Sequence, residues 1–175
     1  MNEKTAVGTI FEDTAPIKDG TVRIKKHTVL FVCTGNTCRS PMCAALFNEK
    51  YSGLTSYAVS AGLFADGSVI SENAVLALEQ YGIKSTDFNN YKVHVSRNVT
   101  ARAMEEADTV IGVTKSHAME LTFRFPAFAT KIMPMPLEIS DPYGGSLSDY
   151  EKCLSDIDAA LEILFSGGTA PSSEE

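Results

Sequence analysis

Short apolar runs alternate with helical patterns along this chain, and the alternation restricts the fold more than any other feature of the sequence. Runs of β-branched and apolar residues predict strands at 27–32, 56–61, 108–114 and 131–135. Apolar residues at helical spacing predict helices within residues 40–51, 71–82, 100–107, 116–125 and 146–168. Because parallel strands need crossover connections, we expect an α/β fold: a four-stranded parallel, doubly wound sheet with helices on both faces.

Start and stop signals set the ends of the predicted helices. Ser40 and Pro41 open the first pattern, since proline is pre-set for a first helical turn. Ser71 is expected to cap the second pattern, and Gly82 to end it. The last pattern carries an apolar stripe made of Tyr150, Leu154, Ile157, Leu161 and Leu164.

The 175 residues are enough for one sizeable core, so we expect one compact domain at 27–166. Residues 1–26 are expected to form an N-terminal arm, either flexible or an added edge element in which residues 21–24 pair as a short strand. Residues 167–175 are expected to be a disordered tail, because they are small and polar.

Charge and apolar content exclude several classes of partner. The formal net charge of −7 argues against a nucleic-acid partner, whose binding requires cationic patches. No apolar run approaches the roughly 20 residues that cross a bilayer, and the N-terminal residues lack the apolar core of a signal peptide. We therefore expect a cytoplasmic protein without a membrane partner, whose four cysteines are reactive or buried thiols rather than disulfides.

The loop CTGNTCRS, residues 33–40, joins the first predicted strand to the first predicted helix. Such a glycine-containing turn directs backbone N–H groups at one point, and the helix N-terminus adds positive partial charge, so an anion is its natural ligand. The loop matches neither the Walker A pattern nor the dinucleotide-binding glycine pattern. It instead places a nucleophile, Cys33, six residues before Arg39.

These residue types fit attack on a phosphoryl group. A thiolate at Cys33 would be stabilised by the N–H groups, by the helix N-terminus and by Arg39. The planar fork of Arg39 can hold two phosphoryl oxygens, and the Ser40 hydroxyl can donate to the thiolate as it leaves in a second step. The Cys-x5-Arg spacing alone is a weak signal, but its position between a strand and a helix strengthens the hypothesis.

Three motifs carry a family resemblance. VLFVCTGNTCRSPM resembles the phosphate-binding loop of the low molecular weight protein tyrosine phosphatase family, and VSAG at 59–62 and DPYGG at 141–145 resemble its later motifs in the same order. The resemblance spans residues 28–165 and implies that residues 27–166 are a phosphatase domain with that family's fold. It also implies a phosphorylated protein substrate and no metal or other cofactor.

The family resemblance implies a two-step mechanism. Cys33 attacks phosphorus, Arg39 holds the phosphoryl group, and Asp141 protonates the leaving group and then activates water. Pro142 supports this role for Asp141, because it favours an extended or turn conformation there; the alternative is a turn aspartate that caps the helix beginning near residue 146. The residues implied in substrate binding are Thr34, Gly35, Asn36, Thr37, Cys38, Ser40, Phe64 and Tyr143.

The leaving group has to be inferred from the residues around the loop. Phe64 and Tyr143 either form walls over the substrate or belong to the core. Tyrosine phosphatases of the family usually carry an apolar branched residue at position 37, whereas Thr37 resembles the bacterial protein arginine phosphatases. Its hydroxyl offers a polar contact near a leaving nitrogen, so we favour phosphoarginine, with phosphotyrosine as the alternative.

Other classes of function remain open alternatives. An arsenate reductase would need resolving cysteines later in the chain, and there is none between Cys43 and Cys153, although a Cys33–Cys38 disulfide would protect the nucleophile. A non-catalytic phosphate-binding module would not need both Cys33 and Asp141.

The cysteines and the three histidines lack the paired spacing of a zinc site, so we expect the histidines to be ordinary surface or core residues. Cys43 and Ala44, where many family members have Ala-Glu, are expected to face the core and the preceding turn. The sequence leaves the oligomeric state and the protein substrate open.

Overall fold

The computed structural model describes residues 14–16, 22–24, 27–53 and 56–165. Four parallel strands form its main sheet in the order β4-β3-β5-β6. Their bounds are His27–Cys33 for β3, Ser56–Gly62 for β4, Thr109–Gly112 for β5 and Ile132–Pro134 for β6. The predicted four-stranded parallel sheet is therefore confirmed. β5 is shorter than predicted because Thr114 serves as the N-cap of the next helix.

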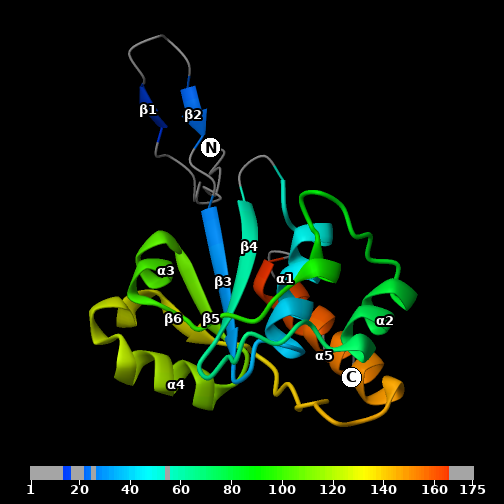
Figure 1. Ribbon diagram of the computed structural model, residues 1–175. Helices are drawn as coiled ribbons and strands as arrows, with labels where there is room; N and C mark the ends of the chain where they lie inside the picture. The colour runs from blue at the N-terminus through cyan, green and yellow to red at the C-terminus, as the bar shows by residue number, and fades with distance from the viewer. Residues whose placement is uncertain (1–13, 17–21, 25–26, 54–55, 166–175) are drawn as a thin grey trace, which may run out of the picture.

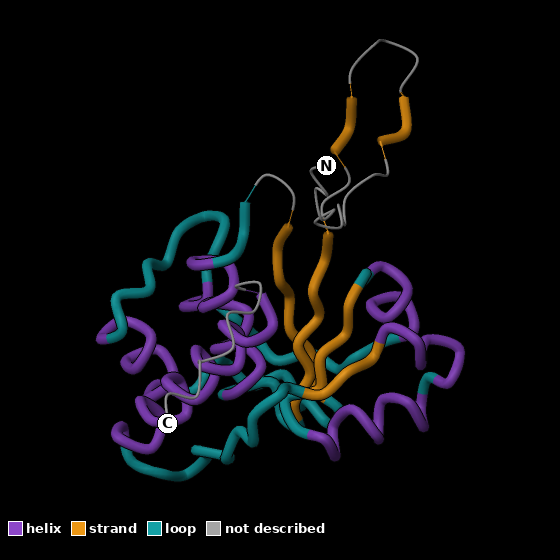
Figure 2. The backbone as a smooth tube through the Cα atoms, turned by 180° about the vertical axis from the view of Figure 1, so that it is seen from behind, coloured by secondary structure: helices purple, strands orange, loops and turns teal. Residues whose placement is uncertain are grey.

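Helices cover both faces of this sheet (Figures 1 and 2). One face carries α1 (Arg39–Lys50), α2 (Glu72–Gln80) and α5 (Leu147–Phe165). The other face carries α3 (Ala101–Glu106) and α4 (Lys115–Arg124). This is the predicted doubly wound arrangement. Two short 3₁₀ helices, η1 (Tyr91–Val93) and η2 (Pro126–Lys131), were not predicted.

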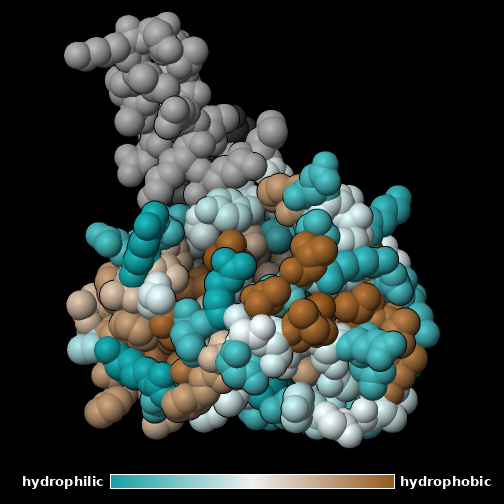
Figure 3. Space-filling model, viewed as in Figure 1, coloured by the Kyte–Doolittle hydropathy of each residue, from teal (hydrophilic) through white to brown (hydrophobic). Residues whose placement is uncertain are grey.

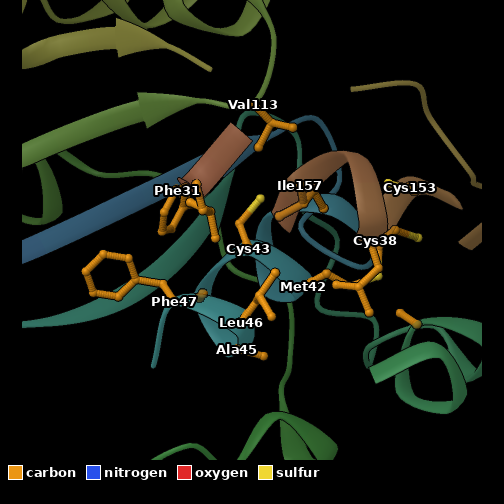
Figure 4. Packing of buried hydrophobic residues seen from close by; sticks show 14 of the residues in the cluster. Phe31, Cys38, Met42, Cys43, Ala45, Leu46, Phe47, Val113, Cys153 and Ile157 are labelled. Atoms are coloured by element: carbon orange, nitrogen blue, oxygen red, sulfur yellow. The ribbon is translucent and has the colours of Figure 1, made fainter. Parts of the chain in front are cut away.

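The central strand β3 separates two hydrophobic cores. Val29, Phe31 and Cys33 point into the core under α1, α2 and α5, whereas Leu30 and Val32 point into the core under α3 and α4. A strand buried on both faces reads as a continuous apolar run, as 28–33 does. Figure 4 shows the larger core, in which Cys43 lies between Phe31 and Ile157, so the expectation that Cys43 faces the core is confirmed.

Two of the predicted helix starts need correction. The helix α1 begins at Arg39 rather than Ser40, and the buried Ser40 hydroxyl lies 3.0 Å from Cys33 Sγ. Ser71 occupies the N-cap position of α2, but its hydroxyl donates to Tyr150 Oη (3.0 Å) instead of to the helix. The predicted stop is confirmed: Gly82 has φ +86° and its N–H bonds to Glu79 O (3.0 Å).

Outside the main sheet, β1 (Thr14–Pro16) and β2 (Val22–Ile24) pair antiparallel, so part of the predicted 21–24 strand exists. The predictions of a flexible arm and a disordered tail otherwise fall outside the described residues. Among the residues described here, no helix combines the length and the apolarity required to cross a bilayer. Apolar side chains on the face shown in Figure 3 are interspersed with hydrophilic ones.

Candidate active site

The loop between β3 and α1 lies at the carboxyl end of the sheet, where ligands bind in doubly wound folds. β3 has β4 on one side and β5 on the other, so the chain leaves β3 at the point where the strand order reverses. A pocket of about 440 Å³ opens at this point. Its lining contains every predicted site residue except Ser40, which contacts Cys33 from behind: the residues are Cys33, Thr34, Gly35, Asn36, Thr37, Cys38, Arg39, Phe64, Asp141 and Tyr143.

Cys33 is the last residue of β3, and its thiol lies almost buried at the base of this pocket. The backbone N–H of Asn36 donates to Cys33 Sγ at 3.3 Å, and Ser40 Oγ lies 3.0 Å from the same sulfur. Because a backbone N–H can only donate, the sulfur accepts the hydrogen bond from Asn36. The strand end thus presents a positioned sulfur atom to the pocket.

Asn36 holds the loop in shape from its centre. It is fully buried and adopts a positive φ of 59°, which asparagine tolerates better than most residues. Its side-chain N–H groups donate to Ser40 Oγ (2.9 Å) and Ser60 Oγ (3.0 Å), and its Oδ1 accepts from the N–H of Arg97 (3.0 Å). The side chain of Asn36 therefore ties the loop to α1, to β4 and to the segment before α3.

Gly62, the last residue of the VSAG motif, lies directly against the loop. A Cβ built at this position would lie 2.8 Å from Thr34 O and 3.0 Å from Asn36 Cβ, too close for either to remain in place. We expect Gly62→Ala to lower kcat/KM for an aryl phosphate by about 10- to 100-fold, because small displacements of a catalytic loop are costly. Gly53→Ala is the matched control, since a Cβ there meets no atom of the described residues within 4 Å. Equal activity of the two variants would contradict this packing argument.

Arg39 and Asp141 meet over the pocket as an ion pair. Arg39 Nη2 donates to Asp141 Oδ2 at 2.6 Å, and the arginine side chain is 8% exposed while the aspartate is 50% exposed. The other carboxylate oxygen accepts from the N–H of Tyr143 (3.2 Å).

The sequence left open whether Asp141 caps the helix that follows it. In the structure that helix, α5, is capped by Asp149, which accepts from the N–H and the hydroxyl of Ser146 (both 2.7 Å). The alternative in which Asp141 caps that helix is therefore wrong.

Two exposed aromatic side chains flank the pocket. Phe64 is 65% exposed and Tyr143 is 76% exposed, so neither belongs to the core. The guanidinium of Arg124 lies 4.4 Å from the centroid of the Phe64 ring and also donates to Leu63 O (3.0 Å). One face of the Phe64 ring is thus supported from the end of α4. Thr37, half-buried in the pocket lining, has its carbonyl fixed by the N–H of Ser71 (2.9 Å).

The sequence interpretation missed two histidines that contact the loop. His94 Nε2 lies 2.9 Å from Asn36 O, and burial lowers the pKa of His94. His117 Nε2 lies 2.9 Å from Thr34 Oγ1. Because His117 is also the third residue of α4, it forms a capping box with Thr114, and the Thr-x-x-His spacing at this helix start was the one available signal.

The buried state of His117 predicts a pH effect on stability. Burial, and secondly the nearby Arg39 guanidinium, lower the pKa of His117 from 6.5 to about 4. Between these values the unfolded chain binds a proton that the folded chain does not, so the free energy of unfolding should fall as pH drops from 6.5 to 4. Denaturant midpoints measured across this range should fall more steeply for the wild type than for His117→Asn. Parallel pH curves for the two proteins would refute this assignment.

All four cysteines are free thiols. Cys38 Sγ lies 3.3 Å from Tyr150 Oη, and burial raises the pKa of Cys153 to about 12 and also that of Cys43. Within the described ranges, no cluster of three or more histidine, cysteine, aspartate or glutamate side chains is arranged to hold a metal ion.

Comparisons with known proteins agree with this geometry. The family model described as "Low molecular weight phosphotyrosine protein phosphatase" matches residues 28–170. A protein-arginine-phosphatase of Bacillus subtilis is 33% identical over 146 residues, which cover 78% of this chain and 93% of that protein. The probable low molecular weight protein-tyrosine-phosphatase EpsP of Ralstonia nicotianae is 28% identical over 140 residues, covering 77% and 91%.

A solved structure shares the fold described above. It is a mutant of the YwlE arginine phosphatase with a phosphorylated active site serine, and it matches with a TM-score of 0.71 at 32% identity, covering 79% of this chain and 93% of that one. The family model spans well over half of the sequence and includes the loop, Gly62 and Asp141. The chain therefore belongs to the low molecular weight phosphotyrosine protein phosphatase family.

Proposed function

We propose that this protein hydrolyses phosphorylated protein side chains through a phosphocysteine intermediate, and that its preferred substrate is protein phosphoarginine. The observation that carries the proposal is the convergence of Cys33 Sγ, the Arg39 guanidinium and the Asp141 carboxylate on one pocket at the carboxyl end of β3. These groups supply the nucleophile, the phosphoryl-binding cation and the acid that the two steps require.

In the first step, Cys33 Sγ attacks phosphorus as the bond from phosphorus to the leaving nitrogen or oxygen breaks. The Arg39 fork holds two phosphoryl oxygens, and Asp141 gives its proton to the leaving atom. In the second step, Asp141 takes a proton from water, which attacks phosphorus as the S–P bond breaks. Ser40 Oγ lies 3.0 Å from Cys33 Sγ, and its hydroxyl, which donates to Ala61 O (3.2 Å), can turn to donate to the departing thiolate.

Two observations support phosphoarginine over phosphotyrosine. Thr37 lines the pocket and offers a hydroxyl where an apolar side chain would offer only bulk. Asp66 and Asp141 also line the pocket, and Asp141, once it has given up its proton, can pair with a guanidinium as it could not with a neutral aromatic ring.

The cysteines make arsenate reduction the weaker proposal. That reaction needs a second thiol that reaches the oxidised nucleophile and reacts as a thiolate. Cys43 and Cys153 are buried, and their pKa values are raised by that burial. Cys38 is buried against Tyr150 Oη. A non-catalytic module is also disfavoured, since both the nucleophile and the acid line the same pocket.

The test compares kcat/KM on matched phosphoarginine and phosphotyrosine peptides under reducing conditions without added metal, with Cys33→Ser as the blank. We expect the wild type to prefer phosphoarginine. In Thr37→Ile that preference should weaken by about 10-fold or more, because a branched apolar side chain replaces the hydroxyl beside the leaving group.

A wild-type preference for phosphotyrosine would assign the chain to the tyrosine-specific members of the family. An unchanged preference in Thr37→Ile would make this residue an ordinary part of the loop. Absence of hydrolysis on both peptides and on a generic aryl phosphate would overturn the phosphatase proposal itself.

A further inference from the structure

His117 connects the start of α4 to the loop that carries the nucleophile. The residue is 6% exposed, and its two ring nitrogens have different partners. Nδ1 lies 2.9 Å from Thr114 Oγ1 and accepts from the backbone N–H of Thr114 (3.1 Å), which can only donate. In the neutral ring the proton therefore lies on Nε2, which is 2.9 Å from Thr34 Oγ1. His117 donates this hydrogen bond and Thr34 accepts it.

Thr34 directly follows Cys33, is exposed and lines the pocket. Its backbone carbonyl accepts from the N–H of Phe64 (2.9 Å), which fixes the backbone on one side of the pocket. A hydroxyl has one hydrogen and two lone pairs. With one lone pair occupied by the His117 Nε2–H, the hydroxyl hydrogen of Thr34 is left to donate elsewhere, and the pocket is the space that this side chain borders.

We propose that His117 is a positioning residue that holds the Thr34 hydroxyl as a hydrogen-bond donor to the phosphoryl group during hydrolysis. This proposal rests on the proposed phosphatase function and adds to it a side-chain donor on the wall of the loop. A donor fixed beforehand is most valuable where negative charge on the phosphoryl oxygens must be held in the transition state. Thr34 would act there together with the Arg39 fork.

The surroundings of His117 keep it in the form that this role requires. Two charged groups act on the pKa of His117. The positive charge of Arg39 opposes protonation of the ring, and the negative charge of Asp141 favours it. Protonation would place a second hydrogen on Nδ1, facing the N–H of Thr114. Burial and Arg39 together lower the pKa to about 4, so the ring is a neutral donor through Nε2 at neutral pH.

The experiment compares Thr34→Val, Thr34→Ser, His117→Asn and the double variant His117→Asn with Thr34→Val, using p-nitrophenyl phosphate under reducing conditions. An asparagine side chain can still accept from the Thr114 N–H but is too short to reach Thr34. We expect Thr34→Val and His117→Asn each to lower kcat/KM by about 10- to 100-fold, the usual value of a hydrogen bond to a charged group. Thr34→Ser keeps the hydroxyl and should recover most of the kcat/KM that Thr34→Val loses, and the kcat/KM of the double variant should fall no further than that of Thr34→Val alone.

Binding of vanadate, a transition-state mimic of phosphoryl transfer, gives a second readout that does not need turnover. Its affinity, measured by calorimetry, should fall in Thr34→Val and His117→Asn by factors similar to those for kcat/KM, while inorganic phosphate binding changes less. A merely structural role would lower thermal stability without this selective loss. If the wild type binds vanadate but does not turn over, the proposed function fails while the donor role is still tested by the two variants.

A matched control exists at the other end of the same sheet. His27 Nε2 lies 3.0 Å from Thr109 Oγ1, which reproduces the histidine–threonine contact far from the pocket. His27→Asn and Thr109→Val should therefore keep wild-type kcat/KM. The proposal is overturned if Thr34→Val retains wild-type kcat/KM and vanadate affinity, or if the losses in the double variant multiply as for two independent residues.

Discussion

Cys33→Ser should abolish turnover of phosphoarginine peptides and aryl phosphates, with a loss of roughly 10⁴-fold or more, while the fold is retained. The reason is that a serine hydroxyl has nearly the shape of the thiol but not its acidity, so little oxyanion is present at neutral pH. Ser40 and the Asn36 N–H, which contact the sulfur, would still find an acceptor in the new hydroxyl. Steady-state rates and circular dichroism of the two purified proteins measure the loss and the retained fold.

Cys153→Ser is the matched control for loss of a thiol. Cys153 is as buried as Cys33, but it lies on α5 and its thiol donates to Ser140 O (3.6 Å), a bond that a serine hydroxyl can also make. This variant should keep near-wild-type turnover. If Cys33→Ser were still active, or if Cys153→Ser lost activity to the same extent without unfolding, Cys33 would not be the nucleophile.

The sheet and the loop could be predicted from the sequence because their signals are local. β3 is a short apolar run that ends at Cys33, and Gly35, Asn36 and Pro41 mark a turn followed by a helix within nine residues. Because all strands of a parallel sheet end at the same edge, the loop that follows β3 was expected at the carboxyl edge of the sheet. The same rule brought Asp141, more than a hundred residues later, to the same edge, where it pairs with Arg39.

Contacts between distant residues carried no such pattern. Ser60, His94 and the N–H of Arg97 bind Asn36 from 24 to 61 residues away, and nothing in their spacing indicates it. Ser71 has the residue type of a helix cap, but its hydroxyl donates to Tyr150 on α5 instead. A local preference worth about 1 kcal/mol is readily overridden by a buried tertiary partner.

Asp141→Asn should lower turnover by an amount that depends on the leaving group. A leaving group of high pKa, such as phenol or a guanidine, must be protonated as it departs, and loss of a general acid costs about 10²- to 10⁴-fold. A leaving group that departs readily as an anion, such as p-nitrophenolate, needs little protonation. We therefore expect a large loss of kcat on phenyl phosphate and phosphoarginine peptides and a smaller loss on p-nitrophenyl phosphate.

The structure offers Asp149→Asn as a matched control, since Asp149 lies in the first turn of α5, directly after the segment that carries Asp141. Asp149 accepts from the N–H and hydroxyl of Ser146, which lowers its pKa, and these contacts cap the helix. Its replacement should lower the melting temperature slightly without changing the ratio of rates for the two aryl phosphates.

In contrast, Asp141 has one carboxylate oxygen bonded to Arg39 and is half exposed to the pocket, where a leaving group can reach it. Equal losses on both aryl phosphates in Asp141→Asn would mean that this carboxylate acts only by orienting Arg39, because the loss of a proton donor must depend on the basicity of the departing atom.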